Sequence, residues 1–230
     1  MLSVGNNFLY TKSLHCSLWF LDKGKRAELQ DNVLFLDARN YYTVVDRTLN
    51  EWSEWQLKNL NAIVWLYRGH VDKYAELMGA YCEILGRLPF AERASQLTAE
   101  IAHRRAEAKQ AVDQASKREK KKVQAECDEK IAALDETLTV AKEAVWLYEK
   151  FGEGVYRDIP GLCKVASRAE SAEKNYSLTP GAYVGVAAVE DDGVDFAQRM
   201  AEIHAELLKL QAESNRVMDT ISKNIKEMGL

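Results

Sequence analysis

The chain has 230 residues, of which 47% are hydrophobic and 29% charged, and it contains three prolines. This composition is typical of a folded, helix-rich protein and excludes a disordered one. The net charge of −4 provides no overall attraction to nucleic acid or to an anionic membrane. Any contact with DNA therefore has to come from a local basic patch or from a partner.

The four cysteines are far apart and show no CxxC spacing, and the four histidines are equally scattered. This pattern argues for reduced thiols and against a disulfide framework or a metal site. The sequence shows no secretory signal and no apolar run of about 18 residues. We therefore expect a cytoplasmic protein without a membrane segment.

Residues 1–48 carry the strand-like sequence. Two apolar runs, Ser13–Leu21 and Val33–Leu36, are separated by a charged connection. Continuous apolar runs, in contrast to alternating ones, are typical of strands that are buried on both faces, as in the middle of an α/β sheet. Two strands cannot form such a sheet alone, so we expect its other strands to lie elsewhere.

Residues 49–88 predict a pair of helices. Ser53 followed by Gln56 is a candidate capping box. Apolar residues then recur at helical spacing on both sides of Arg68-Gly69. The tryptophans of this region invite a base-stacking interpretation, but they lie inside the apolar stripe, and we interpret them as core residues.

Residues 89–151 predict a coiled coil, because two sets of apolar residues step by threes and fours and no glycine or proline lies between Ala91 and Lys150. The two sets are separated by a basic cluster: Lys117, Arg118, Lys120, Lys121 and Lys122. The chain either turns back there as an antiparallel hairpin or continues as one rod roughly 90 Å long. We favour the hairpin, since its two seams can bury each other. The cluster is a candidate phosphate contact, and a solvated hairpin tip is the alternative.

Residues 152–194 form a turn-rich region, in which two turn-bearing segments are joined by a charged, helical piece. We call its second segment the clasp, and define it by Pro180, Gly181, Tyr183, Val184 and Gly185. Proline fixes φ and glycine permits a tight turn, while the residues that follow favour β structure. We expect the clasp to dock on the rest of the chain and to set the direction in which the last helix leaves.

Residues 195–230 predict one amphipathic helix with a long, narrow apolar stripe, interrupted by Ser214. The stripe residues are Phe196, Met200, Ile203, Leu207, Leu210, Val217, Ile221 and Ile225. Such a stripe is typical of a helix–helix seam. It either docks on another subunit or packs back on the coiled coil of this chain.

The sequence shows no complete active site. It lacks a phosphate loop, and no nucleophile–base arrangement has a supporting motif. Phe151–Gly154 superficially resembles a methyltransferase cofactor loop, but it follows a helix, whereas such a loop must follow a buried strand. The acidic run Glu190–Asp192 precedes a helix, where negative charge is favourable. We therefore expect no catalytic, cofactor-binding or metal-ligating residue in this chain.

Several short motifs, in their order along the chain, resemble the modification (M) subunits of type I restriction–modification systems, which methylate N6 of adenine in DNA. The motifs are GNNFLYTKSLHCSLWFLDKGK (5–25), VLFLDARNYY (33–42), NLNAIVWLYRG (59–69), DIPGLCKVA (158–166) and YSLTPGAYVGVA (176–187), and the final helix follows. Two positions depart from the family's pattern. His15 stands where proline is usual, and Ala182 stands where arginine is usual, so we assign no DNA contact to position 182.

The resemblance implies a mainly α fold with a small β remnant. Two or three strands from the end of a Rossmann-like methyltransferase sheet, with Met1–Val4 as an internal strand, precede long coiled-coil helices and a C-terminal amphipathic helix. The family's S-adenosylmethionine loop and its Asn-Pro-Pro-aromatic catalytic motif lie upstream of these residues. The prolines here, Pro89, Pro160 and Pro180, are isolated, so the catalytic motif is absent from this chain.

The function implied is that of a C-terminal assembly portion, inactive alone, that docks on the specificity subunit and meets other subunits and DNA through the complex. S-adenosylmethionine is implied for the complete subunit and not for this chain. Two alternatives remain open. The chain is a self-associating coiled-coil protein, with a homodimer through its coiled coil or its exposed strands, or it is one half of a split methyltransferase.

Overall fold

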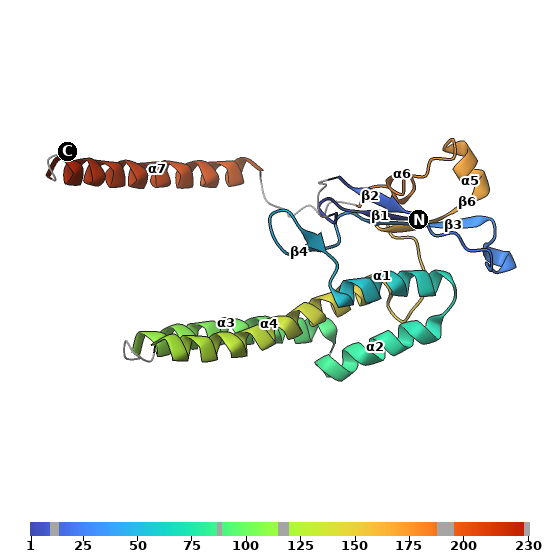
Figure 1. Cartoon of the computed structure of the whole chain (residues 1–230), viewed down its shortest axis with the longest axis horizontal. Coiled ribbons are helices and arrows are strands. Elements are labelled where there is room, and N and C mark those ends of the chain that lie inside the picture. Colours follow the sequence, from blue (N-terminus) through green and yellow to red (C-terminus); the bar gives the residue numbers. More distant parts are fainter. Residues whose placement is uncertain (10–13, 87–88, 115–119, 188–195, 228–230) are drawn as a thin grey trace. The chain divides into compact units, whose positions relative to one another are not determined.

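The computed structural model describes residues 1–9, 14–86, 89–114, 120–187 and 196–227. In the last helix, the side chains of residues 196–198, 219, 222 and 225–227 lie outside that description. The chain divides into two compact units, Met1–Ala187 and Ala188–Leu230 (Figure 1). The predicted fold class, mainly helical with a small sheet, is confirmed.

The first unit contains a four-stranded sheet in the order β2-β1-β3-β6. The strands are β1 (Leu2–Val4), β2 (Cys16–Leu18), β3 (Asn32–Ala38) and β6 (Cys163–Ser167), with a 3-10 turn, η1 (Ala27–Leu29), before β3. β1 lies parallel to β3 and antiparallel to β2, and β6 lies antiparallel to β3. A separate two-stranded ladder joins β4 (Thr43–Val44) to β5 (Asn50–Glu51).

Strand β3 is buried on both faces, as its continuous apolar run predicts. Leu34 and Leu36 belong to the large core that the sheet shares with the helices. Phe35 points the other way and packs with Tyr183 and Val184 in a second, smaller cluster. The central strand thus connects the helical part of the unit on one face with the clasp on the other.

The predicted helical pair is α1 (Glu54–Tyr67) and α2 (Val71–Leu85). The Ser53–Gln56 capping box is present in full. The tryptophans are packed or hydrogen-bonded as core residues: Trp55 lies 4.7 Å from the Tyr81 ring centroid, and Trp52 Nε1 donates to the Tyr41 carbonyl at 2.7 Å. The interpretation of these tryptophans as core residues, and not as base-stacking residues, fits these contacts.

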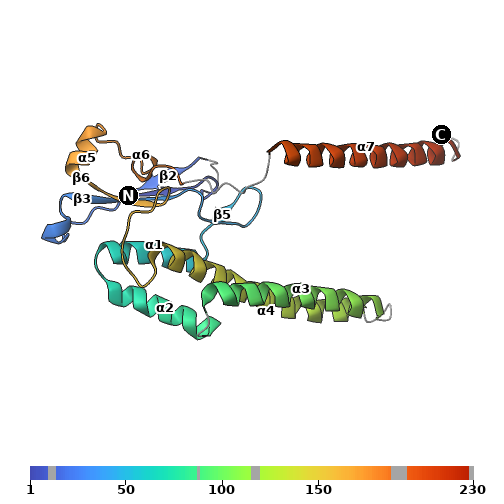
Figure 2. The same cartoon turned by 180° about the vertical axis from the view of Figure 1, so that it is seen from behind.

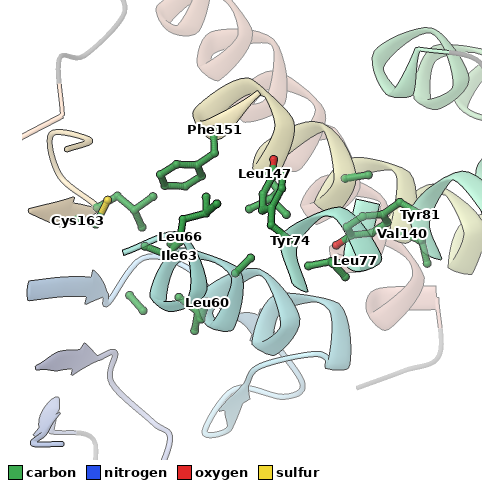
Figure 3. Close-up of a cluster of buried hydrophobic side chains, with 14 of the residues drawn as sticks. Leu60, Ile63, Leu66, Tyr74, Leu77, Tyr81, Val140, Leu147, Phe151 and Cys163 are labelled. Atoms are coloured by element: carbon green, nitrogen blue, oxygen red, sulfur yellow. The ribbon is translucent and has the colours of Figure 1, made fainter. Parts of the chain in front are cut away.

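Helices α3 (Phe90–Gln114) and α4 (Lys120–Phe151) lie side by side as an antiparallel hairpin (Figures 1 and 2). Arg105 Nη2 of α3 lies 2.9 Å from Asp135 Oδ2 of α4. Of the two alternatives, hairpin and rod, the structure therefore has the hairpin. Figure 3 shows how the base of α4 meets α1 and α2, with Leu147 and Phe151 among their buried side chains.

Two regions differ from the sequence-based expectation. The end of the first apolar run lies beyond β2, and there Trp19, Phe20 and Leu21 are 61%, 71% and 95% exposed. The 158–166 segment, which we interpreted as turn-bearing, contains the turn and also most of strand β6 (Cys163–Ser167). It is followed by α5 (Arg168–Glu173) and α6 (Gly181–Val184), and the second unit consists of α7 (Phe196–Glu227).

Candidate functional site: the clasp and the docking stripe

The clasp docks on the outer face of β3. Pro180 is fully buried, and the side chains of Tyr183 and Val184 are also buried. The Tyr183 ring stacks on the Phe35 ring with 3.8 Å between centroids and 7° between planes. The Tyr183 hydroxyl donates to the Ser177 carbonyl at 2.7 Å. The structure therefore brings the predicted clasp residues together.

The backbone of the clasp is helical where the sequence favours β structure. Gly181–Val184 form the single turn α6, and Gly185 ends it with a φ of 70°. The β preference of Tyr183-Val184 is overridden because Pro180 and Gly181 start a turn and because burial against Phe35 holds the turn in place. The expected docking is present, but in a helical conformation.

Gly161 contacts the clasp, a role that its place in the 158–166 motif did not reveal. Its amide donates to the Val184 carbonyl at 2.9 Å. Its φ is +77°, and a Cβ at this position would lie 2.8 Å from the Ala187 nitrogen. A side chain would therefore be strained and would also collide with the chain where it leaves the clasp. The signal in the sequence was the turn-forming pair Pro160-Gly161.

An ion pair at the end of β3 lies beside the clasp. Arg39 Nη2 lies 2.6 Å from Asp37 Oδ2, and the Asp37 side chain is only 8% exposed. The hydrogen bond to Asp37 raises the pKa of Arg39. A Cβ on Gly181 would lie 2.8 Å from Arg39 Nη2, so glycine permits this close approach. Because its charge is matched by Asp37, we do not assign Arg39 to phosphate binding.

A buried polar network, which the sequence analysis did not predict, connects the hairpin to α1 and α2. Tyr41 Oη donates to Glu143 Oε2 of α4, and Asn59 Nδ2 of α1 donates to the Glu143 carbonyl at 3.0 Å. Tyr81 Oη of α2 donates to Asn59 Oδ1 at 2.9 Å. Burial raises the pKa of Tyr41 and of Tyr81, so both hydroxyls keep their protons and act as donors. The polar groups of this network are hydrogen-bonded to one another and hold the helices in position. We therefore assign the network a structural role and no catalytic one.

The docking stripe on α7 is exposed within its own unit. Of the predicted stripe, the described side chains are 40% to 59% exposed: Met200, Ile203, Leu207, Leu210, Val217 and Ile221. Phe196 and Ile225 belong to α7, but their side chains lie outside the described part. Leu208 and Met218, which we did not assign to the stripe, are exposed as well. Within its own unit, the helix therefore presents an uncovered apolar surface along much of its length.

The basic cluster is only partly described. Lys117 and Arg118 lie outside the described residues, while Lys120, Lys121 and Lys122 begin α4. Lys122 Nζ lies 3.9 Å from Glu126 Oε1, on a pair of exposed side chains. These lysines lie on the surface of α4, and nothing else in their arrangement indicates an anion site. A phosphate contact therefore stays a prediction.

Reactive and metal-binding chemistry is sparse. Within the described ranges, no group of three or more His, Cys, Asp and Glu residues could hold a metal ion. The four cysteines are free, and burial raises the pKa of the Cys163 thiol to about 11, so this thiol stays protonated at neutral pH. Among the described helices, none has the length and the hydropathy that crossing a membrane requires.

The Phe151–Gly154 segment does not fit a cofactor. It ends helix α4, with the Gly154 amide donating to the Phe151 carbonyl at 3.0 Å. A Cβ on Gly154 would lie 2.8 Å from Cδ1 of Tyr74. The space beside Gly154 is therefore filled by the Tyr74 ring. A ligand cannot approach this backbone closely, as it does in a cofactor loop.

Residues 1–84 match the family model of N-6 DNA methylases. The chain is also similar to two curated methylase subunits of type I restriction enzymes. The HindI subunit of Haemophilus influenzae is 38% identical over 90 residues, which are 39% of this chain and 20% of that subunit. The MjaIX subunit of Methanocaldococcus jannaschii is 26% identical over 220 residues, which are 96% of this chain and 25% of that subunit.

These matches confirm the resemblance to the modification subunits of type I restriction–modification systems. The chain spans a quarter or less of the length of the two relatives, 25% and 20%. No solved structure matches it significantly.

Proposed function

We propose that the chain is the C-terminal assembly portion of a type I restriction–modification DNA adenine-N6 methyltransferase subunit. It docks on the specificity subunit through the α7 stripe and contributes neither cofactor-binding nor catalytic residues. The observation that carries this proposal is the exposed stripe of α7, in a chain whose relatives are methylase subunits. DNA is reached through the complex.

The exposed stripe favours a binding role on energetic grounds. Burial of a leucine-sized side chain contributes roughly 1.5–3 kcal/mol. Leu207 and Leu210 are 59% and 55% exposed, and they lie one turn apart on a helix with charged residues on its other face. A facing helix that covered such a stripe would gain several contacts of this size, as in a coiled-coil seam.

The clasp supports the same role by fixing the chain ahead of α7. The Gly161–Val184 hydrogen bond and the Tyr183–Phe35 stack hold residues up to Ala187 on the sheet. An anchored exit restricts the positions that the following segment can reach. It thereby reduces the conformational entropy that docking of α7 costs.

S-adenosylmethionine belongs, in this proposal, to the complete subunit. The segment that superficially resembles a cofactor loop, Phe151–Gly154, packs closely against Tyr74, which supports this assignment. When bound to the complete subunit, the cofactor supplies the methyl group. The residues of this chain contribute assembly and not methyl transfer.

Two other functions remain candidates. The α7 stripe equally fits a second copy of this chain, which would make the protein a self-associating coiled-coil protein. The match to N-6 DNA methylases over residues 1–84 also fits one half of a split methyltransferase, whose other half carries the cofactor and catalytic motifs.

Co-expression with a type I specificity subunit, followed by light scattering on the purified material, tests the proposal. The proposed function predicts a stable complex of the two polypeptides and a monomeric chain when it is purified alone. A chain that forms a homodimer alone and ignores the specificity subunit would establish self-association instead.

A further inference from the structure

The charged connection that precedes β3 lies beside the turn that joins α1 to α2. These two segments, far apart in the sequence, line a hollow of about 250 Å³. Its lining residues include Asp22, Lys25, Arg26, Tyr67, Arg68 and His70. We call this space the basic hollow. The proposed function assigns no role to it.

Two cations of the basic hollow are fixed by contacts within the fold. Arg68 Nη2 lies 2.9 Å from Asp22 Oδ2. Lys25 Nζ donates to the Asn32 carbonyl and lies 5.9 Å from the centroid of the Tyr67 ring. Because these side chains are already held, an arriving anion has to order them little further, which lowers the entropic cost of binding.

Arg26 is the third cation, and it lies against the turn between the helices. Gly69 in this turn has a φ of +74°, and a Cβ there would lie 3.3 Å from Arg26 Nη2. Glycine therefore permits the guanidinium to approach the backbone. The nearest carboxylate oxygen, Glu28 Oε1, is 3.7 Å from Arg26 Nη1, and the two side chains are 51% and 65% exposed. Such an exposed pair contributes little and leaves the guanidinium free to meet another anion.

Positive charge outnumbers negative charge around the basic hollow. Among the described residues that line it, Asp22 is the one carboxylate. Both oxygens of Asp22 are engaged: Oδ1 accepts from the Gly24 amide at 2.8 Å, and Oδ2 accepts from Arg68. Burial lowers the pKa of Lys25, while Asp22 opposes this shift and Arg68 adds to it. A further negative charge in the hollow would therefore favour the charged amine.

The helix dipoles do not restore the balance. Helix α1 ends at Tyr67, and the negative end of a helix is equivalent to about half an elementary charge. Helix α2 begins at Val71, across the same turn, and its positive end offsets this charge. The basic hollow thus keeps a surplus of positive charge among its described lining residues, in contrast to Arg39, whose charge Asp37 matches.

We propose that the basic hollow binds one phosphate group. Arg26 and Arg68 offer planar guanidinium donors, which suit phosphate oxygens, and Lys25 adds a compact positive charge. His70 adds an imidazole nitrogen to the lining. The volume of about 250 Å³ is below the roughly 300–1,000 Å³ of sites that enclose a drug-sized ligand, so the hollow fits a phosphate group and not a whole nucleotide.

The phosphate belongs either to a free anion or to the backbone of DNA. Both present the same oxygens to the basic hollow. The inference goes beyond the proposed function, because it concerns a ligand of the first unit and not the docking of α7.

The first test is a titration of the chain with inorganic phosphate, followed through the backbone amides by nuclear magnetic resonance. Sodium chloride holds the ionic strength constant and serves as the reference titrant, because screening alone also alters surface charges. Phosphate should produce saturable shifts of the amides of residues 22–26 and 67–70, and chloride should not. Absent shifts, or equal shifts with both salts, would overturn the proposal.

Substitutions of opposite sign separate a binding role from a structural one. Arg26→Gln should weaken phosphate binding by at least about fivefold, and Arg26→Lys, which keeps the charge, should restore most of it. Asp22→Asn should strengthen binding, because it removes the opposing charge and keeps an oxygen for the Gly24 amide. Arg104→Gln is the matched control, since Arg104 is 52% exposed and its Nη1 lies 3.4 Å from Glu107 Oε2. Thermal unfolding checks that each variant is folded.

Equal binding by the Arg26→Gln and Arg104→Gln variants, or weaker binding after Asp22→Asn, would overturn the proposal. A fluorescently labelled DNA duplex then identifies the source of the phosphate. If the source is DNA, inorganic phosphate competes with the duplex, and Arg26→Gln lowers the slope of the logarithm of the binding constant against the logarithm of the salt concentration by about one. If phosphate binds and the duplex does not, the ligand is a free phosphate and the site stands. None of these variants alters α7, so the outcome is independent of its docking.

Discussion

Tyr183 of the clasp stacks face to face on Phe35 of the central strand, with 3.8 Å between the ring centroids. This contact connects the clasp with β3, a central strand of the sheet that lies within the residues that match N-6 DNA methylases. Substitutions at this contact therefore test directly whether the clasp is fixed on the sheet.

Replacement of Tyr183 by alanine should release the clasp, because it removes the stack and leaves a cavity beside Phe35. Buried aromatic-to-alanine changes cost about 3–5 kcal/mol. Tyr183→Phe keeps the stack and loses only the bond to the Ser177 carbonyl, at a cost of about 1 kcal/mol. Urea unfolding measures both variants, and hydrogen exchange over residues 176–187 shows whether the loss is local. Equal stability of Tyr183→Ala and the unmodified chain would contradict an anchored clasp.

Gly161→Ala should also free the clasp, for a backbone reason. The φ of +77° is strained for any L side chain, and the new Cβ would lie 2.8 Å from the Ala187 nitrogen. We expect a loss of at least about 1 kcal/mol. Gly79→Ala is the matched control, because Gly79 lies in α2 with nothing within 4 Å of its Cβ position, and it should stabilise the chain by about 0.5–1 kcal/mol. If Gly161→Ala were as stable as Gly79→Ala, the close contact between position 161 and the Ala187 backbone would be refuted.

The fold should lose stability in alkali. Burial raises the pKa of Tyr74 from its ordinary value of 10.0 to about 12, and its hydroxyl donates to the Gly152 carbonyl at 2.7 Å. Because the folded-state pKa is the higher one, this contribution is complete below pH 10 and is lost as the pH rises toward 12. Tyr41 and Tyr81 act in the same direction. Urea titrations between these pH values should give a shallower decline for Tyr74→Phe than for the unmodified chain, and parallel declines would contradict the assignment.

The chain alone should neither bind S-adenosylmethionine nor methylate DNA. The sequence lacks the glycine loop and the Asn-Pro-Pro-aromatic motif that the resemblance requires, and the segment 151–154 is closed by Tyr74. Isothermal titration calorimetry with the cofactor should show no heat above dilution. Micromolar binding to this chain by itself would show that the cofactor site lies here after all.

The helices could be predicted because their signals are local. The Ser53–Gln56 box and the apolar spacing lie within the elements that they define. The polar gap between the two seams favoured the hairpin, although it left the continuous rod open. Both kinds of signal are visible in a window of a few turns.

The missed features are those that depend on distant partners. β6 is a short strand, Cys163–Ser167, whose stability comes from pairing with β3, far earlier in the chain. The network around Asn59 depends on Glu143, which comes from another helix. Asn59 inside an apolar stripe was a signal for a buried polar contact, but the sequence does not show which residue meets it. The sequence indicated which residues of the clasp would dock, but not that they would form a helical turn. Packing on Phe35 decided between turn and strand, and this partner lies far away in the sequence.

The most direct test of the central claim is the double substitution Leu207→Glu with Leu210→Glu, measured by co-purification with the specificity subunit. Ala205→Glu with Ala212→Glu is the matched control, because it adds the same charge to the opposite face of α7. Circular dichroism checks that both variants remain folded. The account predicts that the leucine variant loses the complex and the alanine variant keeps it, since burial of each leucine contributes roughly 1.5–3 kcal/mol. A folded leucine variant that still forms the complex would contradict docking through α7, and a collapsed fold would show that the stripe packs on its own chain.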